Sequence, residues 1–138
     1  MTEATKIDFR HRRVAQLADV ADLVEVMFPG NRNQQHAAAR ILLALKMADG
    51  PMASLGTVER RYGMSRRTLQ RTRAKLHRLG IIEHVSWMNS RYGGQHGWRL
   101  SAKMSTALRQ LAGKVDDWRL DKRPERAEKD EMLAGLLR

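Results

Sequence analysis

Residues 57–82 read TVERRYGMSRRTLQRTRAKLHRLGII, and this stretch decides the fold that we expect for the whole chain. Val58 and Tyr62 are four residues apart, as on one face of a short helix. Gly63 permits the positive φ angle that a tight turn between helices requires. Ser65 is a good N-cap, because its hydroxyl can accept an otherwise unpaired backbone N–H. The stretch therefore predicts a short helix, a turn and a longer helix over residues 65–79.

The longer helix has a predicted apolar face and a natural end. Leu69, Thr72, Leu76 and Leu79 recur at intervals of three and four residues, which is the spacing of a buried helical stripe. Gly80 follows immediately and provides the left-handed residue with which many helices end. We expect this stripe to pack on the core.

The opposite face of the same helix is cationic. With Leu69 turned inward, helical geometry places Arg67, Gln70, Arg71 and Arg78 on the outer side. Residues 60–78 contain eight Lys/Arg and no Asp/Glu, so the like charges repel one another without compensating ion pairs. This pattern favours an anionic partner over a merely solvated surface. The DNA major groove admits a helix, and Arg and Gln can contact base edges in pairs of hydrogen bonds.

The segments GMSRRTL (63–69) and LHRLGII (76–82) resemble the helix-turn-helix of bacterial and archaeal winged-helix transcriptional regulators, including the MarR, PadR and GntR types. The resemblance implies a mainly α fold with a small β-hairpin, a winged helix-turn-helix carrying extra N- and C-terminal helices. The residues expected to read the major groove are Arg66, Arg67, Thr68, Gln70 and Arg71. The residues expected to hold phosphates are Arg61, Ser65, Arg73, Lys75 and Arg78.

A hairpin is expected directly after this helix. Branched and aromatic residues in positions 81–88 favour a strand, positions 89–97 are rich in glycine, and positions 98–100 favour a return strand. After a helix-turn-helix such a hairpin is the wing, here residues 88–97. Arg91 suits a narrow, electronegative minor groove, and the neighbouring Tyr92 is included in the predicted DNA contact.

Helices are also expected on both sides of this core. Asp8 is the predicted cap of one helix reaching Phe28, with Val14 in its apolar stripe. Asn31 or Asn33 begins the next helix, and Ser101 begins one that reaches Trp118. The predicted regions are an N-terminal helix (1–30), the winged helix-turn-helix (31–100), a C-terminal helix (101–120) and a charged tail with a short helix (121–138). The two flanking helices are expected to form a homodimer, the alternative being that they pack within one chain.

Composition agrees with an anionic partner. The 138 residues carry a formal net charge of +11, which is more than solubility requires and favours nucleic acid over a membrane surface. There is no cysteine, no membrane-spanning apolar run and no recognisable signal peptide. We expect a cytoplasmic protein associated with the nucleoid.

No sequence pattern indicates catalysis, and enzymatic activity is not expected. The five histidines lack the spacing of a metal site, and no phosphate-binding glycine loop is present, so no metal or cofactor is predicted. A small-molecule effector is compatible with the sequence but not indicated by it. Two alternatives to a transcriptional regulator remain: a plasmid or phage replication, partition or nucleoid-architecture protein, and a winged-helix module for protein–protein contact.

Overall fold

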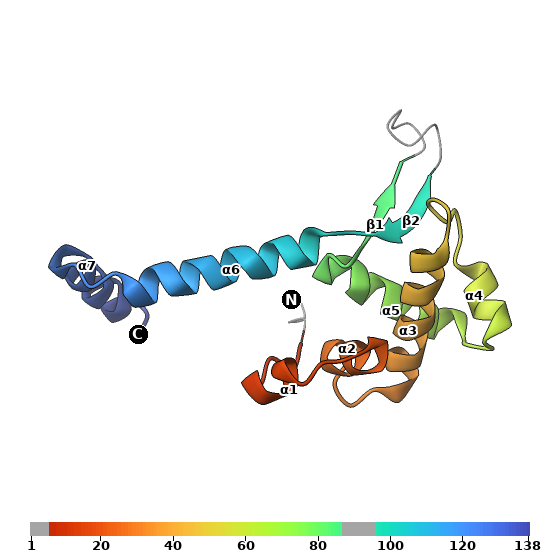
Figure 1. The fold of residues 1–138 in the computed structure, drawn as a ribbon, viewed down its shortest axis with the longest axis horizontal. Coiled ribbons are helices and arrows are strands. Elements are labelled where there is room, and N and C mark those ends of the chain that lie inside the picture. Colours follow the sequence, from red (N-terminus) through yellow and green to blue (C-terminus); the bar gives the residue numbers. More distant parts are fainter. Residues whose placement is uncertain (1–5, 87–95) are drawn as a thin grey trace. The chain divides into compact units, whose positions relative to one another are not determined.

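The computed structural model describes residues 6–86 and 96–138 of the chain (Figure 1). The elements are α1 (His11–Ala15), α2 (Val20–Met27), α3 (Arg32–Met47), α4 (Gly56–Arg61), α5 (Arg66–Leu79), β1 (Ile82–Val85), β2 (Gly97–Leu100), α6 (Lys103–Leu120) and α7 (Pro124–Gly135). The fold is mainly helical with one small antiparallel sheet, as predicted. The chain is divided into two compact units, Met1–Met104 and Ser105–Arg138, and each is described by itself.

Helix α3 is the centre of the first unit, where it contacts α2, α4, α5 and β2. Asn31 caps α3, its side chain accepting the Gln34 backbone N–H, so the first of the two predicted caps is confirmed. Ile41, Leu42 and Leu45 point from α3 into the core. The other buried apolar side chains of this core include Val24, Val26, Met27 and Phe28 near α2, Leu55 and Val58 at α4, Leu69 and Leu76 on α5, and Ile82 on β1.

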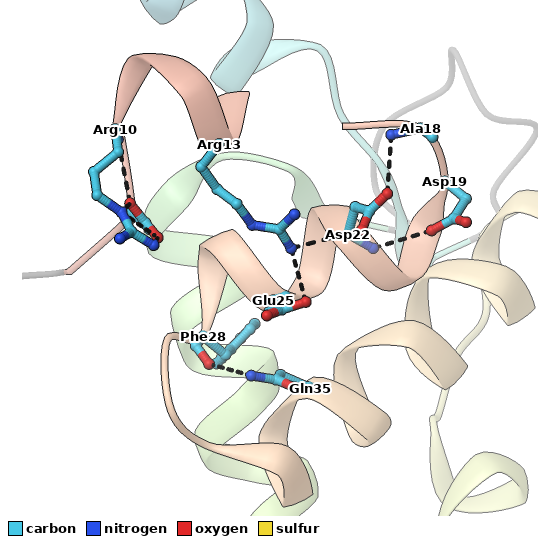
Figure 2. A network of polar contacts seen from close by, with 9 residues as sticks. Arg10, Arg13, Ala18, Asp19, Asp22, Glu25, Phe28 and Gln35 are labelled. Atoms are coloured by element: carbon cyan, nitrogen blue, oxygen red, sulfur yellow. Dashed lines mark hydrogen bonds and ion pairs between the residues drawn. The ribbon is translucent and has the colours of Figure 1, made fainter. Parts of the chain in front are cut away.

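The prediction of one helix from Asp8 to Phe28 is wrong, because the chain breaks between α1 and α2. Asp19 caps α2 by accepting the Asp22 backbone N–H at 3.1 Å, and the Asp22 side chain accepts the Ala18 N–H at 3.0 Å (Figure 2). This reciprocal capping begins a new helix at the break. Asp8 is not a cap but binds Arg10, and Val14 is 42% exposed rather than part of the core.

The helix, turn and longer helix predicted over the decisive stretch are confirmed. Gly63 has φ of 63° between α4 and α5. The Ser65 side chain accepts the Thr68 backbone N–H at 3.1 Å, so it is the N-cap of α5. Gly80 ends α5 in the left-handed conformation with φ of 84°. Leu69, Thr72 and Leu76 are buried, as the helical spacing predicted, and Leu79 is partly buried.

The two strands of the predicted hairpin pair in antiparallel register, with Ile82 opposite Leu100 and His84 opposite Trp98. Gly97, which we placed in the turn, is the first residue of β2. Met52 forms one further bridge to this sheet: its backbone N–H donates to the Trp98 carbonyl at 2.9 Å and its carbonyl accepts the Trp98 N–H at 2.8 Å. Most of the predicted wing, residues 88–97, lies outside the described residues.

The second unit contains most of α6 and all of α7. The Trp118 Nε1–H donates to Asp130 Oδ2 at 3.1 Å, which joins the two helices. Hydrogen bonds from Arg123 lower the pKa of Asp121 to about 2 in the segment between them. Leu111, Val115 and Trp118 are more than half exposed along α6. Of the helices described in the chain, none combines the length and the apolar character needed to cross a membrane.

Candidate nucleic-acid interface

The outer face of α5 is polar and open to solvent. Arg67, Gln70, Arg71 and Arg78 are exposed, whereas Leu69 on the inner face is buried. The predicted division of this helix into a buried stripe and an exposed cationic face is therefore confirmed. Because α5 is capped at both ends, these side chains project from a regular helical backbone.

The arginines of this face are not neutralised within the chain. Among the described residues, Arg67, Arg71 and Arg78 have no carboxylate within ion-pair distance, and Arg66 Nε lies 3.7 Å from Glu59 Oε1 while remaining 77% exposed. Arg10 and Arg13 near the N-terminus differ, because each has a carboxylate partner. Arg13, for example, binds Glu25 at 2.7 Å, as Figure 2 shows. The outer face of α5 thus carries several uncompensated positive charges, and repulsion between these like charges favours an anionic ligand.

One flank of α5 is joined to the hairpin by an aromatic cluster. The Arg73 guanidinium lies over the Trp98 ring, 4.8 Å from its centroid. His77 on α5 and His84 on β1 each meet the same ring edge-on, with centroid distances of 5.6 and 5.0 Å. The cluster orients Arg73 and connects β1 and β2 to α5, so that the two strands lie at a defined position beside the helix.

Ser65, Thr68 and Lys75 are further predicted contact residues that have partners inside the unit. Lys75 lies over the Phe28 ring at 4.6 Å, and burial, together with the charge of Arg78, lowers its pKa. Ser65 donates its hydroxyl hydrogen to Thr68 Oγ1 at 2.9 Å besides capping the helix. These side chains therefore have structural roles that Arg67 and Arg71 do not.

A second cationic group lies at the end of α4. The guanidiniums of Arg40 and Arg61 lie 4.1 and 5.4 Å from the centroid of the Tyr62 ring, and His36 meets that ring edge-on. Arg61 was predicted as a phosphate contact. Arg40 was not, because its helix reads as core by its apolar spacing, and only folding brings it beside Tyr62.

Sequence reasoning also missed Arg60, His77 and Trp98 as members of the surface around α5. Arg60 belongs to the basic run that the sequence displays, whereas no local pattern joins Trp98 to a helix that ends 19 residues earlier. Arg91 and Tyr92 lie outside the described residues. Within the described residues, no three His, Cys, Asp or Glu side chains gather as a metal ion would require.

The arrangement as a whole suits recognition of an extended anion: a helix with unpaired arginines on its outer face, and two strands packed against its flank.

Comparison with protein-family models, with curated proteins and with solved structures finds no match for this chain.

Proposed function

We propose that this protein is a sequence-specific, double-stranded DNA-binding protein with a winged helix-turn-helix, acting as a transcriptional regulator. The observation that carries the proposal is the outer face of α5, on which Arg67, Arg71 and Arg78 are exposed and have no carboxylate partner among the described residues. A DNA duplex supplies the missing negative charge, and its major groove has the width of a helix. Such an activity would place the protein at the nucleoid.

The order of elements supports the winged-helix assignment. A short helix, a tight turn at Gly63, a longer helix and an antiparallel hairpin follow one another without interruption. In the proposed complex α5 lies in the major groove, where Arg67 and Arg71 reach guanine edges and Gln70 reaches an adenine edge. The hairpin, held to α5 through Trp98, would approach the neighbouring sugar–phosphate backbone.

The proposal includes a homodimer formed through the C-terminal helices. Helix α2 buries Val24, Val26 and Met27 in its own unit, so it has little apolar surface left for a partner. On α6, by contrast, Leu111, Val115 and Trp118 follow the alternating spacing of four and three residues that is typical of a coiled-coil seam, and they are exposed.

A second copy of this chain is the occupant that charge favours on that seam. Residues 105–138 contain eight Lys/Arg and seven Asp/Glu and are nearly neutral, whereas residues 1–104 contain 18 and eight. Two C-terminal units can therefore associate without the repulsion that two basic units would experience. A two-fold dimer would bind half-sites about 10 base pairs apart.

The first experiment is selection from a pool of random duplexes at two salt concentrations, followed by sequencing of the bound fraction. A regulator should enrich an inverted repeat. Tight, unselective binding with a steep salt dependence would indicate a nucleoid-architecture protein instead, and repeated sites would indicate a replication initiator. Absence of binding at moderate salt would refute DNA recognition and direct the search to an acidic protein partner.

Variants then test which face of α5 binds. Arg67→Ala and Arg71→Ala should each weaken binding to the selected site by about 1–3 kcal/mol while changing binding to random DNA much less. Arg109→Ala, which removes the same charge from an exposed position of α6, is the matched control. Unchanged affinity of both α5 variants for the selected site would show that this face does not read DNA. Sedimentation of the wild type and Val115→Glu tests the dimer, which the substitution should dissociate.

A further inference from the structure

We infer that the cleft between α4 and α5 is a binding site for a single phosphate group, with Arg60, Arg66 and Arg73 as its cationic ligands. The cleft has a volume of about 330 Å³, and its lining includes these three arginines together with Gln70 and Glu59. The inference rests on the proposed function in so far as the phosphate belongs to DNA. A free phosphate or a nucleotide carries the same chemistry and is distinguished by the experiment below.

Arg60 lies in the cleft beside Gly56, where the absence of a side chain leaves room for its guanidinium. A Cβ atom at position 56 would lie 3.2 Å from Arg60 Nη1 and 3.2 Å from Ser54 Oγ. The Arg60 guanidinium therefore lies against the backbone of Gly56, beside the Ser54 hydroxyl, which accepts the Gly56 N–H at 3.0 Å. A larger side chain at position 56 would compete with Arg60 for this part of the cleft.

Arg73 is held from the other side of the cleft. Its guanidinium lies over the Trp98 ring, and Trp98 is itself fixed by two backbone hydrogen bonds to Met52. A guanidinium that stacks on an aromatic face keeps its N–H groups available at its edge. Arg73 can thus donate to an anion in the cleft without giving up its packing.

The charge in the cleft is unbalanced. Glu59 is the carboxylate of the lining, and it is 3.7 Å from Arg66. Among the described residues, Arg60 and Arg73 have no carboxylate within ion-pair distance. Three guanidiniums around one carboxylate leave a net positive charge that a phosphate would neutralise, and Arg binds phosphate through paired, charge-assisted hydrogen bonds. Gln70 adds a neutral donor at the same cleft.

The test uses the full-length protein and the duplex selected above. Arg60→Gln should raise the Kd roughly tenfold on selected and random duplexes alike and reduce the salt slope by about 0.9, as expected for one lost phosphate contact. Gly56→Ala should weaken binding in the same direction, because it displaces Arg60 while leaving the net charge unchanged. Arg109→Gln on α6 is the charge-matched control and should not alter either quantity.

Two further measurements identify the source of the phosphate. If the ligand is a DNA phosphate, replacing that phosphate by an uncharged methylphosphonate should weaken wild-type binding as much as Arg60→Gln does. Combining the variant with the modified duplex should then reduce the affinity no further than either change alone. In the absence of DNA, inorganic phosphate and pyrophosphate are titrated while the Nε–Hε NMR signals of Arg60, Arg66 and Arg73 are followed.

Saturable shifts that Arg60→Gln abolishes, without an effect of this variant on DNA affinity, would assign the cleft to a free phosphate ligand. If Arg60→Gln and Gly56→Ala leave DNA affinity and salt slope unchanged, and neither phosphate ion shifts the arginine signals, the inference is overturned. The proposed function would survive that result as long as Arg67→Ala and Arg71→Ala still weaken binding to the selected site. If the wild type does not bind DNA at all, the proposed function is refuted, and the phosphate titration alone then tests whether the cleft binds phosphate.

Discussion

Thr72 is the residue on α5 for which the structure makes the sharpest energetic prediction. Its side chain is completely buried between Leu69 and Leu76 in the stripe that faces the core, and among the described residues its Oγ1 has no hydrogen-bond partner. Burying an unpaired hydroxyl costs about 1–3 kcal/mol by protein mutational data. Valine has nearly the same shape without the hydroxyl and a similar helix propensity.

Thr72→Val is therefore expected to raise the free energy of unfolding by about 1–3 kcal/mol. For a unit of this size, each kcal/mol corresponds to roughly 4–8 °C in Tm. The assay is urea unfolding followed by far-UV circular dichroism, with Tm from a thermal scan. DNA affinity should not change, because the side chain points away from the exposed arginines of α5.

Thr72→Ser is the matched control, since it keeps the hydroxyl and removes one buried methyl group. It should destabilise the protein by about 0.8 kcal/mol or more, in proportion to the lost apolar burial. If Thr72→Val is less stable than the wild type with an unchanged urea m value, the hydroxyl has a favourable interaction in the folded state. That result would refute the reasoning from an unpaired buried oxygen.

Three further predictions concern the framework of the first unit. Gly97→Ala should destabilise it by at least about 1–3 kcal/mol in urea unfolding, because φ is +134° and the new Cβ would lie 2.1 Å from the Met52 carbonyl oxygen. The control is Gly113→Ala on α6, which should be neutral or stabilising because the new Cβ would meet no atom within 4 Å. Ser65→Ala should cost about 1 kcal/mol through the lost cap, and an unchanged Tm would contradict this. Burial alone would raise the pKa of Glu83. The hydrogen bonds and positive charges of Arg99 and, after it, Lys103 outweigh burial and lower this pKa below 4.5. The resulting stabilisation is present above pH 4.5 and is lost as the pH falls through the lower pKa that Glu83 has in the folded protein. The wild type and Glu83→Gln should therefore differ less in free energy of unfolding as the pH falls below 4.5, as urea unfolding at several pH values would measure.

Local patterns were sufficient for much of the fold. The turn at Gly63, the cap at Ser65 and the end at Gly80 each depend on the chemistry of one residue and its immediate neighbours. The exposed position of Arg67 and the buried position of Leu69 follow from helical periodicity in the same way. These features are encoded within three or four residues and can be read without knowing the rest of the chain.

The break at Asp19 shows where such reading goes wrong. Apolar residues continue at nearly helical spacing through residues 14–28, and this periodicity predicted one helix. Asp19 and Asp22 also form a local start signal, and in the folded chain their hydrogen bonds outweigh the pattern. Two local rules competed, and apolar spacing alone could not decide between them.

The sequence by itself determined the elements of the first unit from α3 to β2 and the cationic outer face of α5. Only the tertiary structure decided which distant side chains share a surface. Arg73 meets Trp98 because β1, which packs beside α5, pairs with β2, and Arg60 enters the cleft because Gly56 leaves room for it. The packing of α5 on the core also leaves the Thr72 hydroxyl without a hydrogen-bond partner among residues 6–86 and 96–138. Contacts between separate elements depend on how the whole chain packs, and no short-range spacing records them.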